Sequence, residues 1–269
     1  MNRFWRVLVL AVVVIGSTAD VSEITDRKGV PGWDVDRTVP RDVFTFVRIK
    51  YGSNGLRGRY WESWETDMPD AELNLTYRLQ EMTSLRVDPV CKALALTDAE
   101  LFDYPFIYIV EAGYLEFSED EAQILRRYLM NGGFLMVDDF WGQTQYRNFY
   151  RNIKKAFPDR EPRELDIGHP IFNCVFPFYE KPQIPAIGWA IRGRSQGITW
   201  EYHDGTDEQT PQYKGIFDDK DRMMVMICYN TDSGDGWERE GEDEWFFREF
   251  SEKKGYPLAI NIIFYAMTH

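Results

Sequence analysis

The sequence contains few cysteines, few histidines and comparatively little positive charge. Its 269 residues include three cysteines, which are too few and too dispersed for a disulfide framework or a thiolate zinc site. The three histidines have no H-x-x-x-H spacing, which argues against a zinc-hydrolase motif. Lysine and arginine number 31 against 44 aspartates and glutamates, so the formal net charge is −13. That balance argues against binding to nucleic-acid phosphates or to an anionic membrane surface.

Long apolar runs are also lacking, and the one near the amino terminus is short. Arg3 and Arg6 precede the apolar run Val7–Ile15, and small residues follow at 17–19. This pattern predicts a signal peptide over 1–19, and hence an exported, periplasmic or extracellular protein without stable membrane insertion after cleavage. An uncleaved membrane anchor is the alternative, but the run is short for a bilayer of about 30 Å.

After the signal segment, the sequence predicts a linker over 20–41 and a single α/β domain over 42–269. The surest unit begins with the continuous apolar strand Phe106–Val110. A capping box of Ser118 and Glu121 then opens a helix, and Gly132-Gly133 ends it before the next strand, Phe134–Val137. Strand–helix–strand units of this kind predict a mostly parallel sheet with helices on both faces.

Other elements follow from the same patterns. Strands are predicted over 43–50 and 223–228, and helices over 70–83, from about 144, and over 257–267. The polar, glycine-containing stretch 188–219 is expected to leave the sheet as an excursion. An exported chain with three cysteines has either one disulfide and a free thiol or three buried thiols. The flanks of Cys174 and Cys228 resemble packed strand positions, which favours buried thiols.

Several segments resemble one bacterial family. The longest are 103–111 and 125–142, and shorter ones lie at 46–51, 66–71, 169–172 and 230–235. Together they resemble the family called domain of unknown function 4159 over about 41–269. That family resembles class I glutamine-amidotransferase-like domains, especially the trehalose-utilisation type. The resemblance implies a flavodoxin-like three-layer sandwich, and it implies no activity because none is established for the family.

The resemblance also indicates where a nucleophile would lie. Amidotransferases of this fold class place a cysteine on the turn after the strand that follows the paired glycines. Here the residues from Val137 to Gly142 include no cysteine, serine or threonine. Acyl transfer needs an activated nucleophile beside a base, so the domain is not expected to be a glutamine amidotransferase.

Polar and aromatic residues follow the predicted strands, at the edge where ligands bind to open parallel sheets. This expected pocket combines strand-end residues with loop residues that the fold can bring near: Tyr51, Asp67, Glu111, Asp138, Asp139, Trp141, His203, Asn230 and Asp232. Structural capping of the following helices and turns is the alternative role for the aspartates and the asparagine.

Some of these acids could hold a metal. No cofactor is predicted, but the hard oxygen ligands of Asp138, Asp139 and Asp232, with Glu111 and Asp67 near them, would suit a divalent cation such as Ca²⁺ or Mg²⁺. The segment 232–236 lacks the spacing of a calcium loop, so the signal is weak.

The loop over 60–67 contains Trp61 and Trp64 among acidic residues. Flat aromatic faces beside hydrogen-bond acceptors suit a sugar ring or the rim of a protein interface. The alternative is that these tryptophans simply pack the loop onto the sheet.

The sequence therefore favours an exported domain that binds a small molecule, such as a carbohydrate, or a protein partner. The alternative is a carboxylate-based or metal-assisted enzyme that acts on a carbohydrate or cell-envelope substrate. In that case the catalytic candidates are Glu111, Asp138, Asp139 and His203, with the histidine as a general base.

Overall fold

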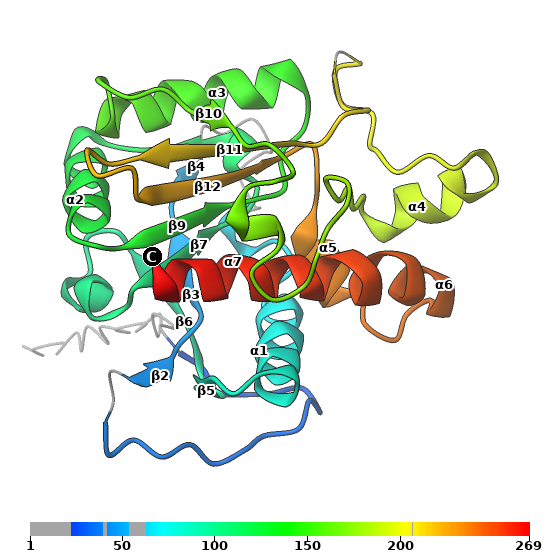
Figure 1. Cartoon of the computed structure of the whole chain (residues 1–269), viewed down its shortest axis with the longest axis horizontal. Coiled ribbons are helices and arrows are strands. Elements are labelled where there is room, and N and C mark those ends of the chain that lie inside the picture. The colour runs from blue at the N-terminus through cyan, green and yellow to red at the C-terminus, as the bar shows by residue number, and fades with distance from the viewer. Residues whose placement is uncertain (1–22, 40–41, 54–62, 206) are drawn as a thin grey trace, which may run out of the picture.

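A mixed β-sheet runs through the centre of the molecule (Figure 1). The computed structural model describes residues 23–39, 42–53, 63–205 and 207–269. Within them the sheet has eight strands, which are in spatial order β1 (Glu23–Ile24), β6 (Cys91–Ala95), β3 (Val47–Lys50), β7 (Phe106–Ile109), β9 (Phe134–Val137), β12 (Met223–Tyr229), β11 (Gln212–Phe217) and β10 (Arg163–Glu164).

The five central strands, β6-β3-β7-β9-β12, are all parallel, whereas β1, β11 and β10 pair antiparallel at the two edges. Numbered along the chain, the parallel strands therefore have the order 2-1-3-4-5. In such a sheet the direction of winding changes between the first and third strands, here β3 and β7. Ligands bind beyond the carboxyl ends of the strands near that point.

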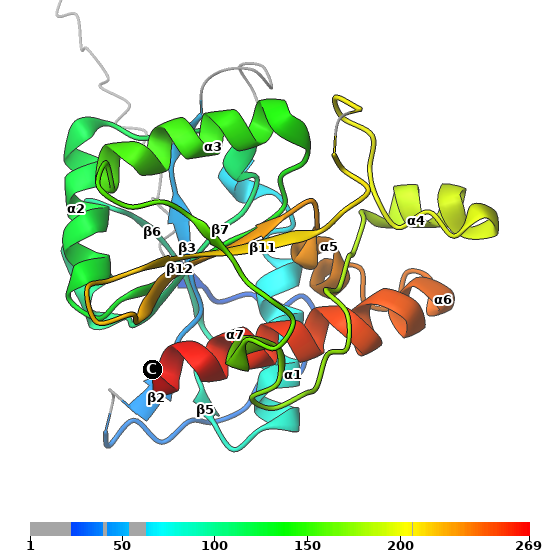
Figure 2. The same cartoon turned by 45° about the horizontal axis from the view of Figure 1, so that its top comes forward.

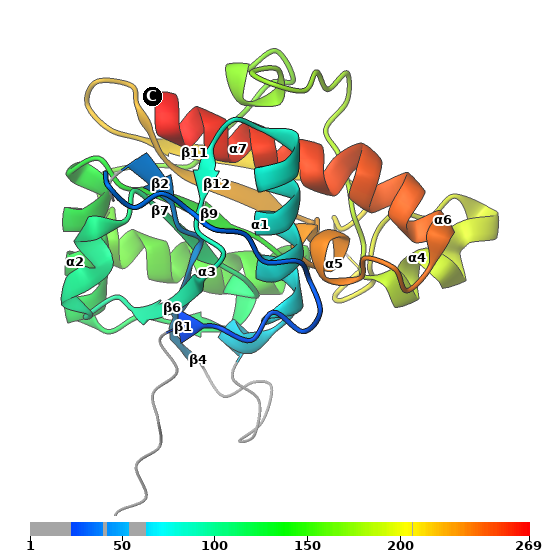
Figure 3. The same ribbon diagram turned by 90° about the horizontal axis from the view of Figure 1, so that it is seen from below.

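Helices cover both faces of the sheet (Figures 2 and 3). Helices α1 (Asp70–Met82) and α7 (Tyr256–Thr268) lie on one face, and α2 (Glu119–Met130) and α3 (Gly142–Ala156) on the other. The alternation of side chains along a strand explains the two layers. On β7, Phe106 and Tyr108 enter the core under α1 and α7, whereas Ile107 and Ile109 enter the core under α2 and α3.

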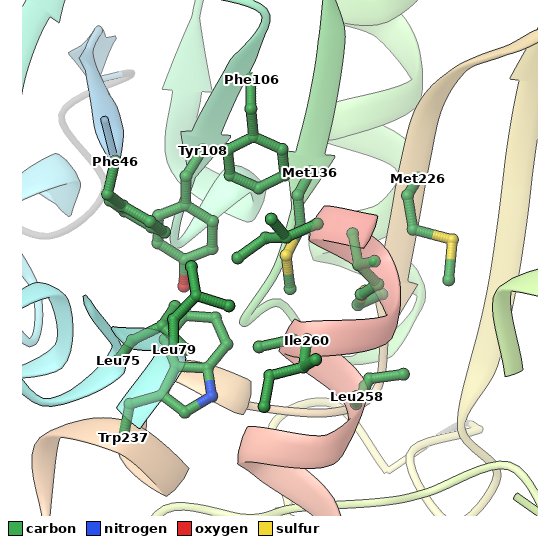
Figure 4. Packing of buried hydrophobic residues seen from close by; sticks show 14 of the residues in the cluster. Phe46, Leu75, Leu79, Phe106, Tyr108, Met136, Met226, Trp237, Leu258 and Ile260 are labelled. Carbon is green, nitrogen blue, oxygen red and sulfur yellow. The ribbon is translucent and has the colours of Figure 1, made fainter. Parts of the chain in front are cut away.

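The core beneath α1 and α7 also fixes the short helix α5 (Ser233–Glu238), which follows β12 (Figure 4). Trp237 of α5 is fully buried, and its ring centroid lies 5.7 Å from that of Tyr108 on β7. Burying an aromatic side chain contributes roughly 1.5–3 kcal/mol. The polar start of α5 is therefore held firmly at the carboxyl edge of the sheet.

The remaining elements are short. Two small sheets pair β2 (Val43–Phe44) with β5 (Arg86–Val87) and β4 (Gly52–Ser53) with β8 (Leu115–Glu116). Helix α4 (Ile187–Gly193) stands out from the molecule, and α6 (Glu244–Phe246) leads through the π-helical segment Phe247–Gly255 into α7. The 3₁₀ segments are Ser63–Glu65, Ala99–Asp103, Ala112–Tyr114, Pro170–Phe172 and Arg194–Gln196. None of the helices in the described ranges is long and apolar enough to span a bilayer.

The predicted unit from 106 to 139 is confirmed, including the capping box. The Ser118 hydroxyl accepts a hydrogen bond from the Glu121 backbone N–H, and the Glu121 carboxylate accepts one from the Ser118 backbone N–H. The predicted strand 43–50 is instead divided between β2 and β3. The segment 23–39, expected within a linker, contributes β1, and the Trp33 indole donates a 2.7 Å hydrogen bond to the Val87 carbonyl.

Two other expectations were wrong. The stretch 188–219 contains β11, an antiparallel strand of the main sheet; its polar Lys214 and Gly215 interrupt the apolar pattern that would have indicated a strand. Cys174 is exposed, because the apolar run around it forms a surface loop rather than a strand. Cys91, on β6, and Cys228, on β12, are buried as expected.

Candidate cation-binding site

The candidate site lies where β7, β9 and β12 end. Each of these parallel strands is followed by a non-glycine residue with a left-handed backbone: Glu111 (φ 53°), Asp139 (φ 52°) and Asn230 (φ 59°). Asp67, in the turn before α1, has the same conformation (φ 65°). This backbone costs an L-residue about 1–2 kcal/mol, least for Asp and Asn, and it clusters at functional sites.

Three carboxylates from distant parts of the chain meet here, and we call them the first triad: Asp67, Asp139 and Asp232. Each offers a ligand oxygen, and these oxygens lie within 4.8 Å of one another. Asp139 is 8% exposed and Asp232 is 3% exposed, so two of the three are almost fully buried. A cluster of this kind must hold protons or a cation, because burial of unpaired charge is costly.

The hydrogen bonds of the first triad leave oxygens available. Asp139 Oδ1 accepts from the Trp141 indole Nε1 at 3.2 Å, and Asp232 Oδ1 accepts from the Asp235 backbone N–H at 2.8 Å. Among the described residues, no donor reaches Oδ2 of either side chain. Oδ2 of Asp67 is buried and also lacks a hydrogen-bond partner there.

Burial and like charge raise the pKa of all three carboxyls well above the ordinary value for aspartate. For Asp139, burial is the largest cause and the charges of Glu111 and Glu201 add to it. For Asp67 and Asp232, burial again leads, followed by neighbouring acids that include Asp235. The first triad therefore binds protons tightly when no cation is present.

One buried base, Arg48, lies near the first triad; its Nε and Nη1 face other partners, and its Nη2 is buried with no hydrogen-bond partner among the described residues. The Arg48 guanidinium lowers the pKa of Asp67, against the effects of burial and the nearby acids. Arg48 forms an ion pair with Glu72, and its Nη1 donates to the carbonyls of Trp64 and Thr66. Along the described chain, no ion pair links the first triad to a lysine or arginine.

A second triad shares Asp67 and adds Asp235 and Glu238 of α5, again with oxygens within 4.8 Å. Here a base is present: Arg239 Nε lies 3.3 Å from Asp235 Oδ1 and 2.7 Å from Glu238 Oε2. Asp235 Oδ2 also accepts from the Ile187 backbone N–H. Burial raises the pKa of Asp235, and it raises that of Glu238 to about 7, although Arg239 opposes both shifts.

Asp138 has a structural role beside the triads. Its oxygens accept from the Ser233 N–H (2.8 Å), the Ser233 hydroxyl (3.1 Å), the Gly234 N–H (3.2 Å) and the Tyr108 hydroxyl (3.3 Å). Burial raises its pKa to about 7 in spite of these hydrogen bonds. Asp138 thus joins β9 to the start of α5, which is the capping role that the sequence left open.

His203 is held in one tautomer. The Trp141 backbone N–H donates to Gln145 Oε1 (2.8 Å), so Gln145 Nε2 must be the nitrogen that donates to His203 Nδ1 (3.3 Å). The hydrogen of the neutral ring is then on Nε2, which donates to Glu201 Oε2 (2.9 Å). The ring also stacks on that of Trp141, with centroids 6.2 Å apart. Both nitrogens are therefore engaged, and neither is available as a general base.

A family model described as Domain of unknown function (DUF4159) matches residues 45–267. The chain belongs to this family. A search of curated proteins found no match. Both triads, Asp138 and His203 all lie inside the matched DUF4159 region.

Within the DUF4159 domain, several predicted ligand residues make contacts inside the protein. The Tyr51 hydroxyl donates to the Val110 and Glu111 carbonyls, and Trp64 is packed in the core under α2 and α3. Asn230 accepts from the Gly142 N–H and donates to the carbonyls of Asp207 and Thr210. Trp61 lies outside the described residues.

Sequence reasoning missed four residues that shape the DUF4159 site: Glu201, Asp235, Glu238 and Arg239. A signal for two of them was present, because Asp232, Asp235 and Glu238 follow one another at intervals of three residues. That spacing places them near one another at the start of a helix. Glu201 had no such signal, since it comes from a distant loop.

Proposed function

We propose that this DUF4159 domain is an exported binding domain that holds a hard divalent cation in the first triad and uses it to bind an oxygen-rich ligand such as a carbohydrate. One observation carries the proposal. The first triad combines three carboxylates whose ligand oxygens lie within 4.8 Å of one another, and it has no ion pair with a lysine or arginine among the described residues. Ca²⁺ and Mg²⁺ prefer such oxygen ligands.

The fold supports a binding site at this position. The strand order 2-1-3-4-5 is that of flavodoxin-like sheets, whose ligands lie beyond the carboxyl ends of the strands. It is also compatible with an amidotransferase-like architecture that lacks the nucleophile. The turn after β9 contains Asp138, Asp139, Phe140 and Trp141, and both buried cysteines lie on strands elsewhere in the sheet.

The hydrogen bonding argues against Asp138 and His203 as acid–base groups, and so supports binding rather than catalysis by these two candidates. Proton transfer needs a group with an available lone pair or proton near the reacting atom. The oxygens of Asp138 are occupied by α5 and Tyr108, and both ring nitrogens of His203 are engaged. Export is proposed from the charged and then apolar start of the sequence, and a mature amino terminus at Asp20, found by intact-mass measurement, would test it.

Calorimetric titration and thermal melting with Mg²⁺, Mn²⁺ and Ca²⁺ test the cation site. A cation at 100 times its Kd should stabilise the protein by about 2.7 kcal/mol. The Asp139→Asn and Asp232→Asn substitutions should each abolish this response, and Asp232→Asn should keep the fold, because asparagine caps a helix as well as aspartate.

The matched control is Asp219→Asn. Asp219 lies in the turn between β11 and β12, at the opposite end of the sheet, with its side chain 81% exposed. This variant should respond as the parent protein does. An equal response in Asp139→Asn, or no response of the parent protein to any of the three cations, would refute the proposal.

A further inference from the structure

We infer that the first triad selects a small six-coordinate cation, Mg²⁺ or Mn²⁺, over Ca²⁺ and leaves about half of its coordination shell to neutral oxygen ligands. The inference rests on the proposed cation site and deepens it. Its basis is the number of carboxylate oxygens that the surrounding hydrogen bonds leave available.

Asp139 and Asp232 each have one oxygen that accepts a hydrogen bond and one that accepts none from the described residues. The Trp141 indole N–H occupies Oδ1 of Asp139, and the Asp235 backbone N–H occupies Oδ1 of Asp232. Both side chains are more than nine-tenths buried, so neither can turn freely to present both oxygens. With Oδ1 engaged in this way, each carboxylate favours binding a cation through Oδ2 alone.

Asp67 completes the set but cannot enlarge it much. Its Oδ2 lies against the backbone of α5, where a Cβ atom on Gly234 would be 2.2 Å away. This close packing fixes the carboxylate, which can supply one oxygen or at most two. The three carboxylates of the first triad thus provide three or four oxygens.

That number separates the candidate cations. Ca²⁺ takes six to eight oxygens at 2.3–2.6 Å and commonly uses a bidentate carboxylate, whereas Mg²⁺ takes six at about 2.0–2.1 Å and usually keeps several waters. Three or four protein oxygens fit the second pattern. Two or three positions then stay open for water or ligand.

The local charge indicates what fills the open positions. Three ionised carboxylates outweigh a divalent cation by one charge, and the negative charges of Glu111 and Glu201 also act on Asp139. A phosphate or carboxylate ligand would be repelled. Two neighbouring hydroxyls of a sugar can bind the cation without adding charge, so the geometry points to a neutral diol.

Trp141 is then the residue that sets the selectivity, although it does not bind the cation itself. Replacing it in the Trp141→Phe variant removes the N–H donor and frees Oδ1 of Asp139. Asp139 can then bind in bidentate mode, as Ca²⁺ prefers. The ratio of Mg²⁺ to Ca²⁺ affinity should fall by about tenfold, equivalent to about 1.4 kcal/mol.

Competition titrations on the full chain test the inference. In the parent protein, Mg²⁺ and Mn²⁺ should bind about tenfold or more tightly than Ca²⁺. Electron paramagnetic resonance of bound Mn²⁺ in ¹⁷O-enriched water should show about two or three inner-sphere waters. Methyl α-D-mannopyranoside should displace waters from the Mn²⁺, and inorganic phosphate should not.

Tighter binding of Ca²⁺, a Mn²⁺ ion with no bound water, or displacement of water by phosphate alone would overturn the inference while leaving the cation site intact. Failure of all three cations to bind would overturn the proposed function, and the inference with it. If Trp141→Phe does not fold, the water count and the competition in the parent protein still decide the question.

Discussion

The two carboxylate triads share Asp67 but differ in how their negative charge is balanced. The second triad has its own base, since Arg239 pairs with both Asp235 and Glu238. In the first triad, Asp139 and Asp232 have only N–H donors, and no lysine or arginine within the described ranges pairs with them. The negative charge of the second triad is thus balanced by an arginine of the protein itself. The charge of the first triad must be balanced by protons or a cation from solution.

The origin of the residues differs as well. Asp235, Glu238 and Arg239 are close together in sequence, so forming α5 is enough to bring their charges together. The first triad is assembled from residues 67, 139 and 232, which meet only when β9, β12 and the turn before α1 are all in place. The charges on α5 therefore stabilise a single helix. The first triad instead forms only when the carboxyl edge of the sheet is correctly folded.

The largest effect that would separate the triads is a dependence of stability on pH. Acids whose pKa is raised in the folded state contribute stability that is complete below about pH 4 and is lost as the pH rises through the raised value. Asp138 and Glu238 titrate at about 7, and the pKa of each first-triad carboxyl is also raised. In the presence of a chelator, the free energy of unfolding should therefore fall by at least about 3 kcal/mol between pH 5 and pH 8, because a single acid with a pKa of about 7 accounts for about 2.7 kcal/mol of it.

Denaturant titrations at several pH values check this expectation. A saturating divalent cation should remove the part of the fall that comes from the first triad, because it replaces the protons there at high pH, whereas the part from Asp138 and Glu238 should remain. The lowered pKa of His169 acts in the opposite sense, but it involves a single group. If stability in the presence of a chelator stays constant or rises between pH 5 and pH 8, the buried carboxyls do not have raised pKa values.

A substitution at Gly234 should disturb both triads through their shared member. A Cβ atom there would meet Asp67 Oδ2 at 2.2 Å, so Gly234→Ala must displace the Asp67 carboxylate. We expect a destabilisation of about 1–3 kcal/mol and loss of the thermal shift with Mg²⁺.

Gly236→Ala is the matched control on the same helix. A Cβ atom at Gly236 would have its nearest neighbour, Ile184 Cγ2, at 3.5 Å, which is an ordinary contact. This variant should gain up to about 1 kcal/mol from better helix propensity and should keep its cation response. Normal Mg²⁺ binding by Gly234→Ala would show that Asp67 is not a ligand.

The smallest effect should come from Arg239→Gln, which makes the second triad resemble the first. Because the Arg239 side chain is 34% exposed, solvent screens its ion pairs, and its loss should cost only about 1 kcal/mol. The informative readout is stoichiometry: without its internal base, the second triad should bind a second Mn²⁺ ion in calorimetric titrations.

Arg248→Gln provides the comparison, since it removes an exposed arginine whose ion pair with Glu252 involves no member of either triad. The Arg248→Gln variant should bind one Mn²⁺ ion, the number expected for the parent protein. If Arg239→Gln also binds one, the difference between the triads is not a matter of counter-charge.

The parts of the fold that were predictable share strong local signals. The unit from Phe106 to Asp139 has two continuous apolar strands, a capping box and paired glycines, and each appears where expected. Strand β11 lacks such a signal, because Lys214 and Gly215 break its apolar pattern and only tertiary pairing with β12 makes it a strand. Strand β6 was not predicted for a related reason: Lys92 interrupts its short apolar run, which lies next to the edge strand β1.

For the candidate site, topology was the useful guide. The rule that ligands lie beyond parallel strand ends placed Asp139 and Asp232 together, and the loop residue Asp67 joins them. The sequence could not indicate which acids are already occupied. Asp138 and Asp139 are adjacent and chemically identical. Asp138 accepts hydrogen bonds from Ser233 and Gly234 of α5, which are 95 and 96 residues away, whereas Asp139 accepts one only from Trp141 among the described residues. The sequence does not show which of the two will meet α5.

The left-handed backbone at Glu111, Asp139 and Asn230 carries a consequence for the protein's history. Glycine would adopt this conformation without steric cost, so each position could be relaxed by a single change. Asp139 has both backbone strain and charge repulsion, so the acid lowers stability at the position where it would bind a cation. In a selection for heat resistance without a cation, variants with glycine or a neutral residue at position 139 should therefore be favoured, and they should have lost cation binding.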